Sequence, residues 1–297
     1  ISTSTYEGGV FSFEHTPSSN DEWIALGPVY NFSRWTELAG QIDDHVMVDS
    51  LVVLTQTLQG RPFHLLKITD PSVPDTEKGA VWGTARQHPA EVAGSWMAEG
   101  LIVWLLGDDR QAAELRRRAV FYLMPFMNPD GVALGNYRVN SVGANLNREW
   151  SNQNPATAPT VAAAAQAVES FVASGRRFEF FVDLHAYSSL RKNFFFYSGR
   201  DRAPELEVQE IEALMDLFQT NNGDFTRSGS APSGDDTRLA RGWAFENFGV
   251  QAVTFEASYQ DLTYGPHAYQ YMTPDRYMAL GEGLGKSLAE LLFGVVP

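Results

Sequence analysis

The sequence contains no cysteine. Disulfide bonds and thiolate metal ligands are therefore excluded, so any metal site must use histidine and carboxylate side chains. Basic residues are also few, because 22 lysines and arginines face 36 aspartates and glutamates, which gives a net charge of −14. This balance argues against nucleic acid or an anionic membrane as a partner. We expect no membrane span, because no apolar run approaches the roughly 20 residues that crossing a bilayer requires.

The apolar content of 44% is ample for a sizeable core. From about residue 50, short apolar segments of strand length alternate with longer segments of helical periodicity. This alternation predicts an α/β fold in which helices cover both faces of a sheet. The predicted strands are 50–58, 62–68, 80–85, 120–124, 178–184, 193–197 and 250–255, and the predicted helices are 34–44, 89–106, 109–118, 158–173, 206–219, 237–248 and 274–293.

The first 30 residues have a different composition, rich in serine, threonine, glycine and aromatic residues. Segments 10–15 and 22–26 have the pattern of short strands separated by a turn. We expect residues 1–45 to form the remnant of a β-rich domain with a linker helix, and residues 46–297 to form the main domain. Because the chain begins at Ile1, we also expect that an upstream segment has been removed.

Three potential metal ligands lie shortly after the ends of two predicted strands. His88 and Glu91 stand three residues apart after strand 80–85, and His185 ends strand 178–184. In α/β sheets, ligands bind at the carboxyl ends of strands. Two histidines and one glutamate form a standard catalytic zinc site that leaves a position open. Taken singly, His88 and Glu91 read as a surface pair and His185 as a core histidine, but their common placement favours a metal.

Glu256 follows the predicted strand 250–255, so it should lie at the same edge of the sheet. A carboxylate beside a metal can take a proton from water as the water attacks a carbonyl group. The alternative is a solvated acid at a strand terminus. Arg138 and Arg148 suit the binding of a carboxylate or an oxyanion, and Asn147 would add an amide donor. The alternative for each arginine is a surface ion pair.

Several ordered motifs together resemble the zinc carboxypeptidases of the carboxypeptidase A superfamily. The sequence around His88 and the residues just before Arg138 are most similar to the cytosolic carboxypeptidase subfamily. The resemblance covers about residues 50–295. The motifs are Arg86-Gln87-His88-Pro89-Ala90-Glu91, Asn128-Pro129-Asp130-Gly131-Val132, Gly135-Asn136-Tyr137-Arg138, Asn145-Leu146-Asn147-Arg148, Leu184-His185 and Thr254-Phe255-Glu256.

The resemblance implies a three-layer α/β/α sandwich around a mixed, mostly eight-stranded sheet, preceded here by short N-terminal strands. It implies that residues 46–297 are the catalytic domain and that residues 1–45 keep only the end of the β-sandwich domain of that subfamily. It implies one Zn²⁺ per chain. The implied zinc ligands are His88, Glu91 and His185, and the implied general base is Glu256.

The resemblance also implies how substrate is held. Arg138 would polarise the scissile carbonyl and stabilise the oxyanion, while Asn147 and Arg148 would bind the terminal carboxylate. Two features of the family are altered or missing here. Asn145 stands where the family often has an acid that orients the first zinc histidine. The loop 221–236 lacks the mobile tyrosine of classical members.

Two further residue types are candidates for substrate contact. The tyrosine candidates are Tyr187, which we take as a substrate-binding residue, and two alternatives, Tyr259 and Tyr264. Arg238, in Asp236-Thr237-Arg238, is where we expect a contact to an acidic C-terminal side chain, with a helix-surface charge as the alternative.

The leading functional prediction is a zinc metallocarboxypeptidase that acts on the C-terminus of a peptide or protein. The first alternative is a zinc amidohydrolase of N-acyl amino acids or cell-wall peptides, because these substrates also carry a carboxylate. The second is an inactive zinc-binding module that recognises peptides. The subfamily resemblance implies the cytoplasm, and the missing initial methionine, the acidic composition and the absence of cysteine leave export as the alternative. The sequence carries no signal of oligomeric state.

Overall fold

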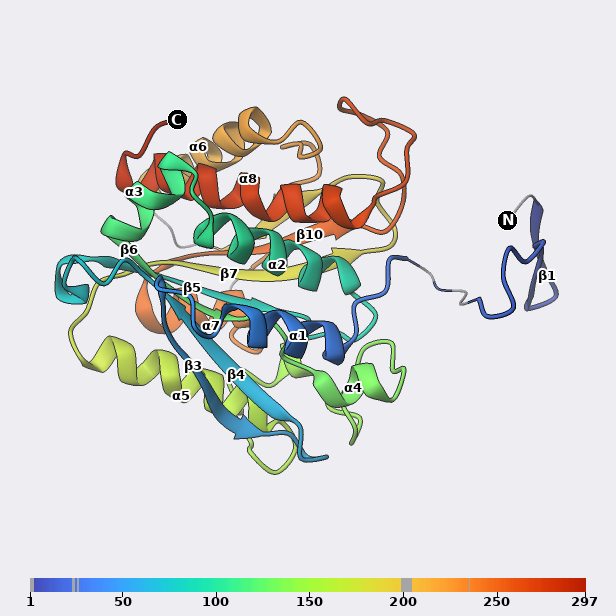
Figure 1. Ribbon diagram of the computed structural model, residues 1–297, viewed down its shortest axis with the longest axis horizontal. Coiled ribbons are helices and arrows are strands. Elements are labelled where there is room, and N and C mark those ends of the chain that lie inside the picture. Colours follow the sequence, from blue (N-terminus) through green and yellow to red (C-terminus); the bar gives the residue numbers. More distant parts are fainter. Residues whose placement is uncertain (1–2, 23–24, 26, 199–204, 235) are drawn as a thin grey trace.

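A mixed eight-stranded sheet forms the centre of the molecule (Figure 1). The computed structural model describes residues 3–22, 25, 27–198, 205–234 and 236–297. The strand order is β3-β4-β6-β5-β7-β10-β8-β9. The strands are β3 (Val48–Gln56), β4 (Pro62–Ile68), β5 (Gly79–Ala85), β6 (Ala119–Met124), β7 (Phe178–Tyr187), β8 (Phe194–Tyr197), β9 (Ala231–Pro232) and β10 (Gln251–Ser258).

The middle of the sheet is parallel, since β5 pairs with β6 and β7, and β7 pairs with β10, all in parallel. Every residue of β5 and of β6 is buried. This burial on both faces explains why these strands are continuous apolar runs rather than alternating ones. The antiparallel pairs β3–β4, β4–β6 and β8–β10 extend the sheet outward from this parallel centre.

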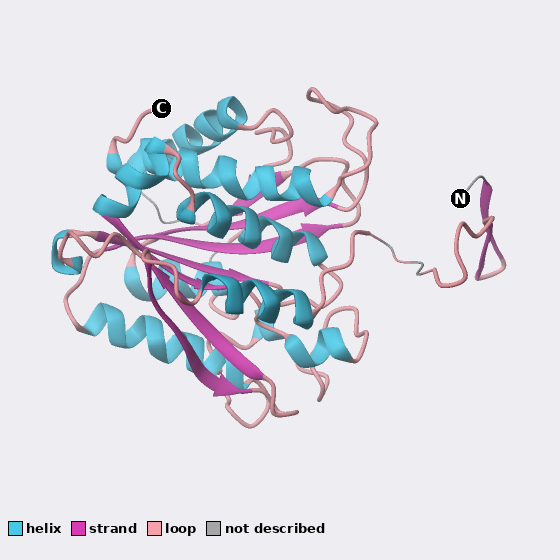
Figure 2. Ribbon diagram, in the orientation of Figure 1, coloured by secondary structure: helices cyan, strands magenta, loops and turns pink. Residues whose placement is uncertain are grey.

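Helices cover both faces of the sheet, which confirms the predicted three-layer architecture (Figure 2). One core cluster joins α1, α2, α3, α6 and α8 to one face, and a second joins α5 and α7 to the other. Alternate residues of one strand enter opposite clusters, as Val81 and Trp82 do. The helices are α1 (Phe32–Ile42), α2 (Val92–Leu106), α3 (Arg110–Arg118), α4 (Pro129–Ala133), α5 (Pro159–Ala173), α6 (Glu205–Asn221), α7 (Ala240–Phe248) and α8 (Pro274–Phe293).

Helices α2 and α8 pack so closely that glycine is required at their contact. A Cβ atom on Gly100 would lie 2.1 Å from the carbonyl oxygen of Met278. A Cβ atom on Gly281 would lie 1.9 Å from the carbonyl oxygen of Met97. Both distances are far shorter than van der Waals contact, so the two backbones approach only because these side chains are absent.

The N-terminal region contains the hairpin β1 (Thr3–Glu7) and β2 (Val10–Glu14), which lies apart from the body of the molecule in Figure 1. Strand β2 agrees with the predicted segment 10–15, whereas β1 was not predicted. Most of the predicted strand 22–26 lies outside the described residues.

Helix α1 packs its Trp35 into the main core, and the Trp35 indole donates to His64 Nδ1 at 3.1 Å. The division of the chain at residue 45 stays a prediction.

Segment 128–131 has the composition of a turn, but it begins the short helix α4. The residues that favour a turn also favour a helix start, because Pro129 occupies the first helical position and the Asn128 side chain accepts from Gly131 N at 3.0 Å. Asp130 fixes the element by accepting from Thr57 Oγ1 at 2.6 Å.

None of the helices in the described ranges combines the length and apolar character that crossing a lipid bilayer requires.

Candidate active site

Strand pairing brings the predicted site residues to one edge of the sheet. Glu256 on β10 lies directly opposite His185 on β7 in the parallel register. Ala85, the last residue of β5, lies opposite Leu184. His88 therefore follows the end of β5 beside the end of β7. The structure thus brings together the three strand ends that the sequence singled out.

Residues 88–91, called the metal turn below, are held by their own backbone and by Arg86. The Glu91 backbone N–H donates to the His88 carbonyl at 3.1 Å. Arg86 is buried, and its Nε donates to the Pro89 carbonyl at 2.8 Å. Arg86 also has a left-handed backbone with φ of 61°, which is costly for a residue other than glycine. The side-chain hydrogen bond therefore stabilises a sharp change of direction between β5 and the metal turn.

His88, Glu91 and His185 form a buried cluster whose possible ligand atoms lie within 4.8 Å of one another. His88 Nδ1 lies 2.8 Å from Glu91 Oε1, and His185 Nδ1 lies 2.6 Å from Glu91 Oε2. Two imidazole nitrogens and a carboxylate converging at these distances match the donor set of a catalytic zinc site. The residues present therefore fit the metal.

The outer nitrogen of each histidine contacts a different kind of partner. His88 Nε2 lies 3.0 Å from Asn145 Oδ1, and His185 Nε2 lies 2.7 Å from Asp183 Oδ2. Such contacts fix the ring and leave Nδ1 to bind the metal. Asn145 thus lies where the sequence analysis expected it. The sequence analysis missed Asp183, although a carboxylate two residues before His185 in a largely apolar strand lies on the same face as His185 and was a usable signal.

Asp183 is fully buried, and its oxygens accept further hydrogen bonds. Thr84 Oγ1 donates to Oδ1 at 2.7 Å, and Gln87 Nε2 donates to Oδ2 at 2.7 Å. The Gln87 side chain is held in turn by Trp150, whose indole N–H donates to Gln87 Oε1 at 2.8 Å. These donors satisfy the oxygens of Asp183 in a place where an unpartnered polar group would be very unfavourable.

The two histidines differ in charge because their surroundings differ. Burial lowers the pKa of His88, so this ring is neutral near pH 7. Burial also opposes a charge on His185, but the carboxylates of Asp183 and Glu91 outweigh it and raise the pKa of His185 well above its ordinary value. Without a metal, His185 therefore holds a proton at neutral pH. A cation between these groups would take the place of that proton.

Glu256 lies beside this cluster, and burial raises the pKa of its carboxyl to about 8. The Glu91 carboxylate adds to this rise, while the charge on His185 opposes it. Its Oε2 atom is buried and has no hydrogen-bond partner among the residues that the structure describes. Glu256 is thus a buried carboxyl that lines the site and has one oxygen without a hydrogen-bond partner among the described residues, so it could serve as a proton acceptor.

These groups line a cavity of about 220 Å³, called the metal cavity below. Arg138 reaches over the cluster, with its NH1 atom 3.9 Å from Glu91 Oε1. Arg148 donates to the Asn147 carbonyl at 2.6 Å. Asn147 bridges two elements, because its Nδ2 lies 3.2 Å from His185 Nε2 and its Oδ1 accepts from the backbone of Ala240 at 2.9 Å. The residues that line this cavity include His88, Glu91, Arg138, Asn147, Arg148, His185, Tyr187, Arg241 and Glu256.

The structure places Arg238 differently from the other predicted site residues. Its side chain is exposed and forms an ion pair with Asp236, with NH2 2.7 Å from Oδ2. It is not among the residues that line the metal cavity. Arg241 lines that cavity instead, is buried, and donates to Ser198 Oγ at 2.7 Å. The role of Arg238 as a contact to the C-terminal side chain stays a prediction. The sequence analysis did not select Arg241 as a site residue.

The three tyrosine candidates have different surroundings. Tyr187 lines the metal cavity and packs against the edge of Phe194. The Tyr264 hydroxyl already has a partner within the protein, because it donates to the Asp224 carbonyl at 2.7 Å. The Tyr259 hydroxyl is buried and has no hydrogen-bond partner in the part of the chain that is described. Tyr187 and Tyr259 therefore remain the candidates for contact with a ligand.

Comparisons with known proteins agree with this geometry. The chain matches the zinc carboxypeptidase family (peptidase M14) over residues 35–279. It is 31% identical over 245 residues to human cytosolic carboxypeptidase 6, a match that covers 80% of this chain and 48% of that protein. The chain thus spans about half the length of the curated relatives that it first matches.

Solved structures show the same fold. A metallo-carboxypeptidase from Burkholderia cenocepacia superposes with a TM-score of 0.86 at 29% identity, over 98% of this chain and 76% of that one. A metallo-carboxypeptidase from Pseudomonas aeruginosa, solved with (2-guanidinoethylmercapto)succinic acid, superposes with a TM-score of 0.80 at 26% identity. That match covers 90% of this chain and 70% of the other.

Proposed function

Because the chain belongs to the zinc carboxypeptidase family, we propose that it hydrolyses the last peptide bond of peptides or protein tails. The observation that carries the proposal is the position of Glu256. Its carboxyl, with one oxygen free of hydrogen bonds among the described residues, lies opposite His185 in the sheet and opens on the same cavity as Arg138 and Arg148. A base, a potential metal site and two guanidinium groups thus converge on one space.

One Zn²⁺ per chain would be held by His88, Glu91 and His185. When bound there, zinc supplies Lewis acidity and makes water acidic enough to react near neutral pH. The protein's contribution is to hold the three donors in place, since Asn145 and Asp183 fix the two rings from behind.

Glu256 would accept the proton of the attacking water and pass it to the departing amine. Its buried carboxyl can serve both steps, because a pKa near neutrality allows a group to take up and release a proton. Arg138 would donate to the oxygen of the scissile carbonyl as negative charge develops on that oxygen. Its partly exposed side chain, 43% accessible, leaves it free to move onto a substrate.

Asn147 and Arg148 would bind the terminal carboxylate of the substrate. Burial and the neighbouring charge of Arg138 lower the pKa of Arg148, and an anionic ligand would relieve both effects. Binding of this carboxylate would restrict cleavage to the last residue of a chain. Tyr187 would contact the substrate from the opposite wall. For the C-terminal side chain, Arg238 stays our predicted contact to an acidic group, and Arg241, which lines the metal cavity, is the alternative.

The test combines zinc analysis with the release of free amino acids from peptides that end in Glu, Phe or Lys. Glu256→Gln should keep its zinc and lose turnover, and amidated peptides should resist the wild-type protein. Cleavage of N-acyl amino acids alone would indicate an amidohydrolase, and zinc binding without any turnover would indicate a recognition module. A C-terminal peptide library would then measure the preferred residue, with Arg238→Ala and Arg241→Ala compared.

The names of the curated relatives support the further proposal that the protein acts in the cytoplasm. Fractionation of the source cells, with the intact protein detected by an antibody, tests this proposal. Recovery from the medium or the periplasm would contradict it.

A further inference from the structure

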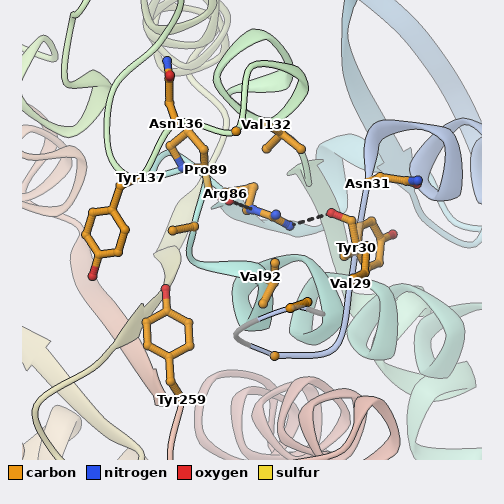
Figure 3. A pocket seen from close by; sticks show the side chains of 14 residues that line it. Val29, Tyr30, Asn31, Arg86, Pro89, Val92, Val132, Asn136, Tyr137 and Tyr259 are labelled. Carbon is orange, nitrogen blue, oxygen red and sulfur yellow. Dashed lines mark hydrogen bonds between the residues drawn. The ribbon is translucent and has the colours of Figure 1, made fainter. Parts of the chain in front are cut away.

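A second cavity of about 350 Å³ is lined in part by Pro89 and Ala90 of the metal turn (Figure 3). The two cavities share their dividing wall. Within the metal turn, His88 and Glu91 line the metal cavity, whereas Pro89 and Ala90 line the second cavity. In the next segment, Arg138 lines the first cavity, and its neighbour Tyr137 lines the second. A ligand can therefore contact both cavities by crossing a single turn of backbone.

The walls of the second cavity are largely apolar. Val92 and Val132 come from the main domain, and Val29 comes from the segment before α1 (Figure 3). Arg86 brings a positive charge, but its guanidinium group is directed to protein oxygens. Its NH1 atom donates to the Tyr30 carbonyl at 3.1 Å, and its Nε donates to Pro89, as described above. The cavity therefore suits an uncharged side chain.

Tyr259 adds a polar group at the boundary between the cavities. It lies three residues after Glu256 and lines the second cavity, where Figure 3 shows its hydroxyl pointing toward the segment that carries Pro89. Burial and the nearby Glu91 carboxylate raise the pKa of Tyr259, so the hydroxyl keeps its proton. A buried hydroxyl without a hydrogen-bond partner, as this one is among the described residues, is unfavourable. A ligand carbonyl at this point would satisfy it.

We propose that the second cavity binds an apolar side chain of the substrate upstream of the scissile bond, and that Tyr259 donates to the substrate backbone between the two cavities. This inference rests on the proposed function, because it requires a peptide in the metal cavity. Ala90 is two residues from His88, a span of at most about 7 Å, and a substrate advances about 3.3–3.6 Å per residue. The apolar residue should therefore lie two to four positions before the C-terminal residue.

Binding can be measured without relying on catalysis. Zinc-loaded Glu256→Gln protein is titrated with fluorescent peptides in which one Phe occupies the second, third or fourth position before the C-terminal residue, with Gly at the other positions. One of these positions should improve Kd about tenfold over the all-Gly peptide, as expected for burial of a large apolar side chain. Equal Kd values across the series would overturn the proposal. Cleavage of the same peptides by the wild-type protein separately tests the proposed function.

Filling the cavity provides the second arm of the test. Val29→Trp and Val132→Trp place bulk in the cavity from two different segments and should each abolish the preference for Phe. Val142→Trp, at an exposed valine that does not line the cavity, is the matched control and should keep the preference. Tyr259→Phe should weaken binding of all peptides that cross the metal turn, but not of an N-acyl dipeptide. A preference that survives both tryptophan substitutions, or equal effects of Tyr259→Phe on long and short ligands, would overturn the assignment.

Discussion

The contrast between Asp183 and Asn145 gives a sharp prediction about zinc affinity. The substitution Asp183→Asn keeps the size of the side chain. The amide can turn so that its oxygen still accepts from His185 and Gln87, while its nitrogen faces the Thr84 hydroxyl, which can accept. The hydrogen bonds therefore survive, and the loss is mainly the negative charge behind His185.

The magnitude follows from the role of such partners in metal sites. Loss of a carboxylate behind a ligating histidine typically weakens metal binding about 10–100-fold, or about 1.4–2.8 kcal/mol. We expect Kd for zinc to rise by this factor. The effect should be larger at pH 9 than at pH 7. In the wild-type protein, the raised pKa of His185 means that zinc competes with a proton near neutrality, and this competition ends as the pH rises through that pKa. Asp183→Asn lowers this pKa and so also removes part of the competition at pH 7.

Competition with a chelator of known affinity measures Kd, and thermal unfolding of the metal-free proteins shows whether the variant is folded. The reciprocal change Asn145→Asp places a carboxylate behind His88 and should tighten zinc binding up to about tenfold. The double variant should lie between Asp183→Asn and the wild type, by the product of the two single effects, if the two histidines act independently. A folded Asp183→Asn protein with wild-type zinc affinity at both pH values would refute this reasoning.

Three further predictions concern other parts of the molecule. Zinc binding at pH 7 to Glu256→Gln protein, which lacks the other carboxyl that can release a proton, should release about one proton from His185, which calorimetry in buffers of different ionisation enthalpy will detect; zero release would mean that the ring is neutral in the metal-free protein. Arg148→Ala should impair binding of peptides with a free C-terminus and spare amidated ligands, whereas an equal effect on both would exclude a carboxylate contact. Gly281→Ala should reduce the free energy of unfolding by about 1–3 kcal/mol in urea titrations, because the new Cβ atom meets Met97. Gly40→Ala, where a Cβ atom meets nothing within 4 Å, is the control and should be neutral or stabilising.

The central strands and the metal cluster could be predicted from the sequence because local patterns of residues indicate both. Continuous apolar runs mark buried parallel strands, and His88, His185 and Glu256 follow the ends of such runs. Family resemblance then supplied the order of the motifs. These signals do not depend on which strands become neighbours.

The missed features depend on long-range packing that local patterns do not encode. Asp183 has its role because β5 and β7 pair with Thr84 opposite Asp183, a register that only the folded sheet defines. The choice between Arg238 and Arg241 depends on the start of α7 at Ala240 and on which side of the helix meets the cavity. The second cavity requires the segment around Val29 to pack beside the metal turn, far away in sequence.

The pairing of His185 with Glu256 also has a consequence for how this protein can change over evolution. The two residues occupy opposite positions on neighbouring parallel strands, so the backbone hydrogen bonds of the sheet fix their separation. A deletion of one residue within either strand would turn its functional side chain to the opposite face of the sheet. Insertions in the loops between the strands would leave this spacing intact. The site is therefore insulated from loop diversification, and the residues at its rim can change without altering the alignment of His185 with Glu256.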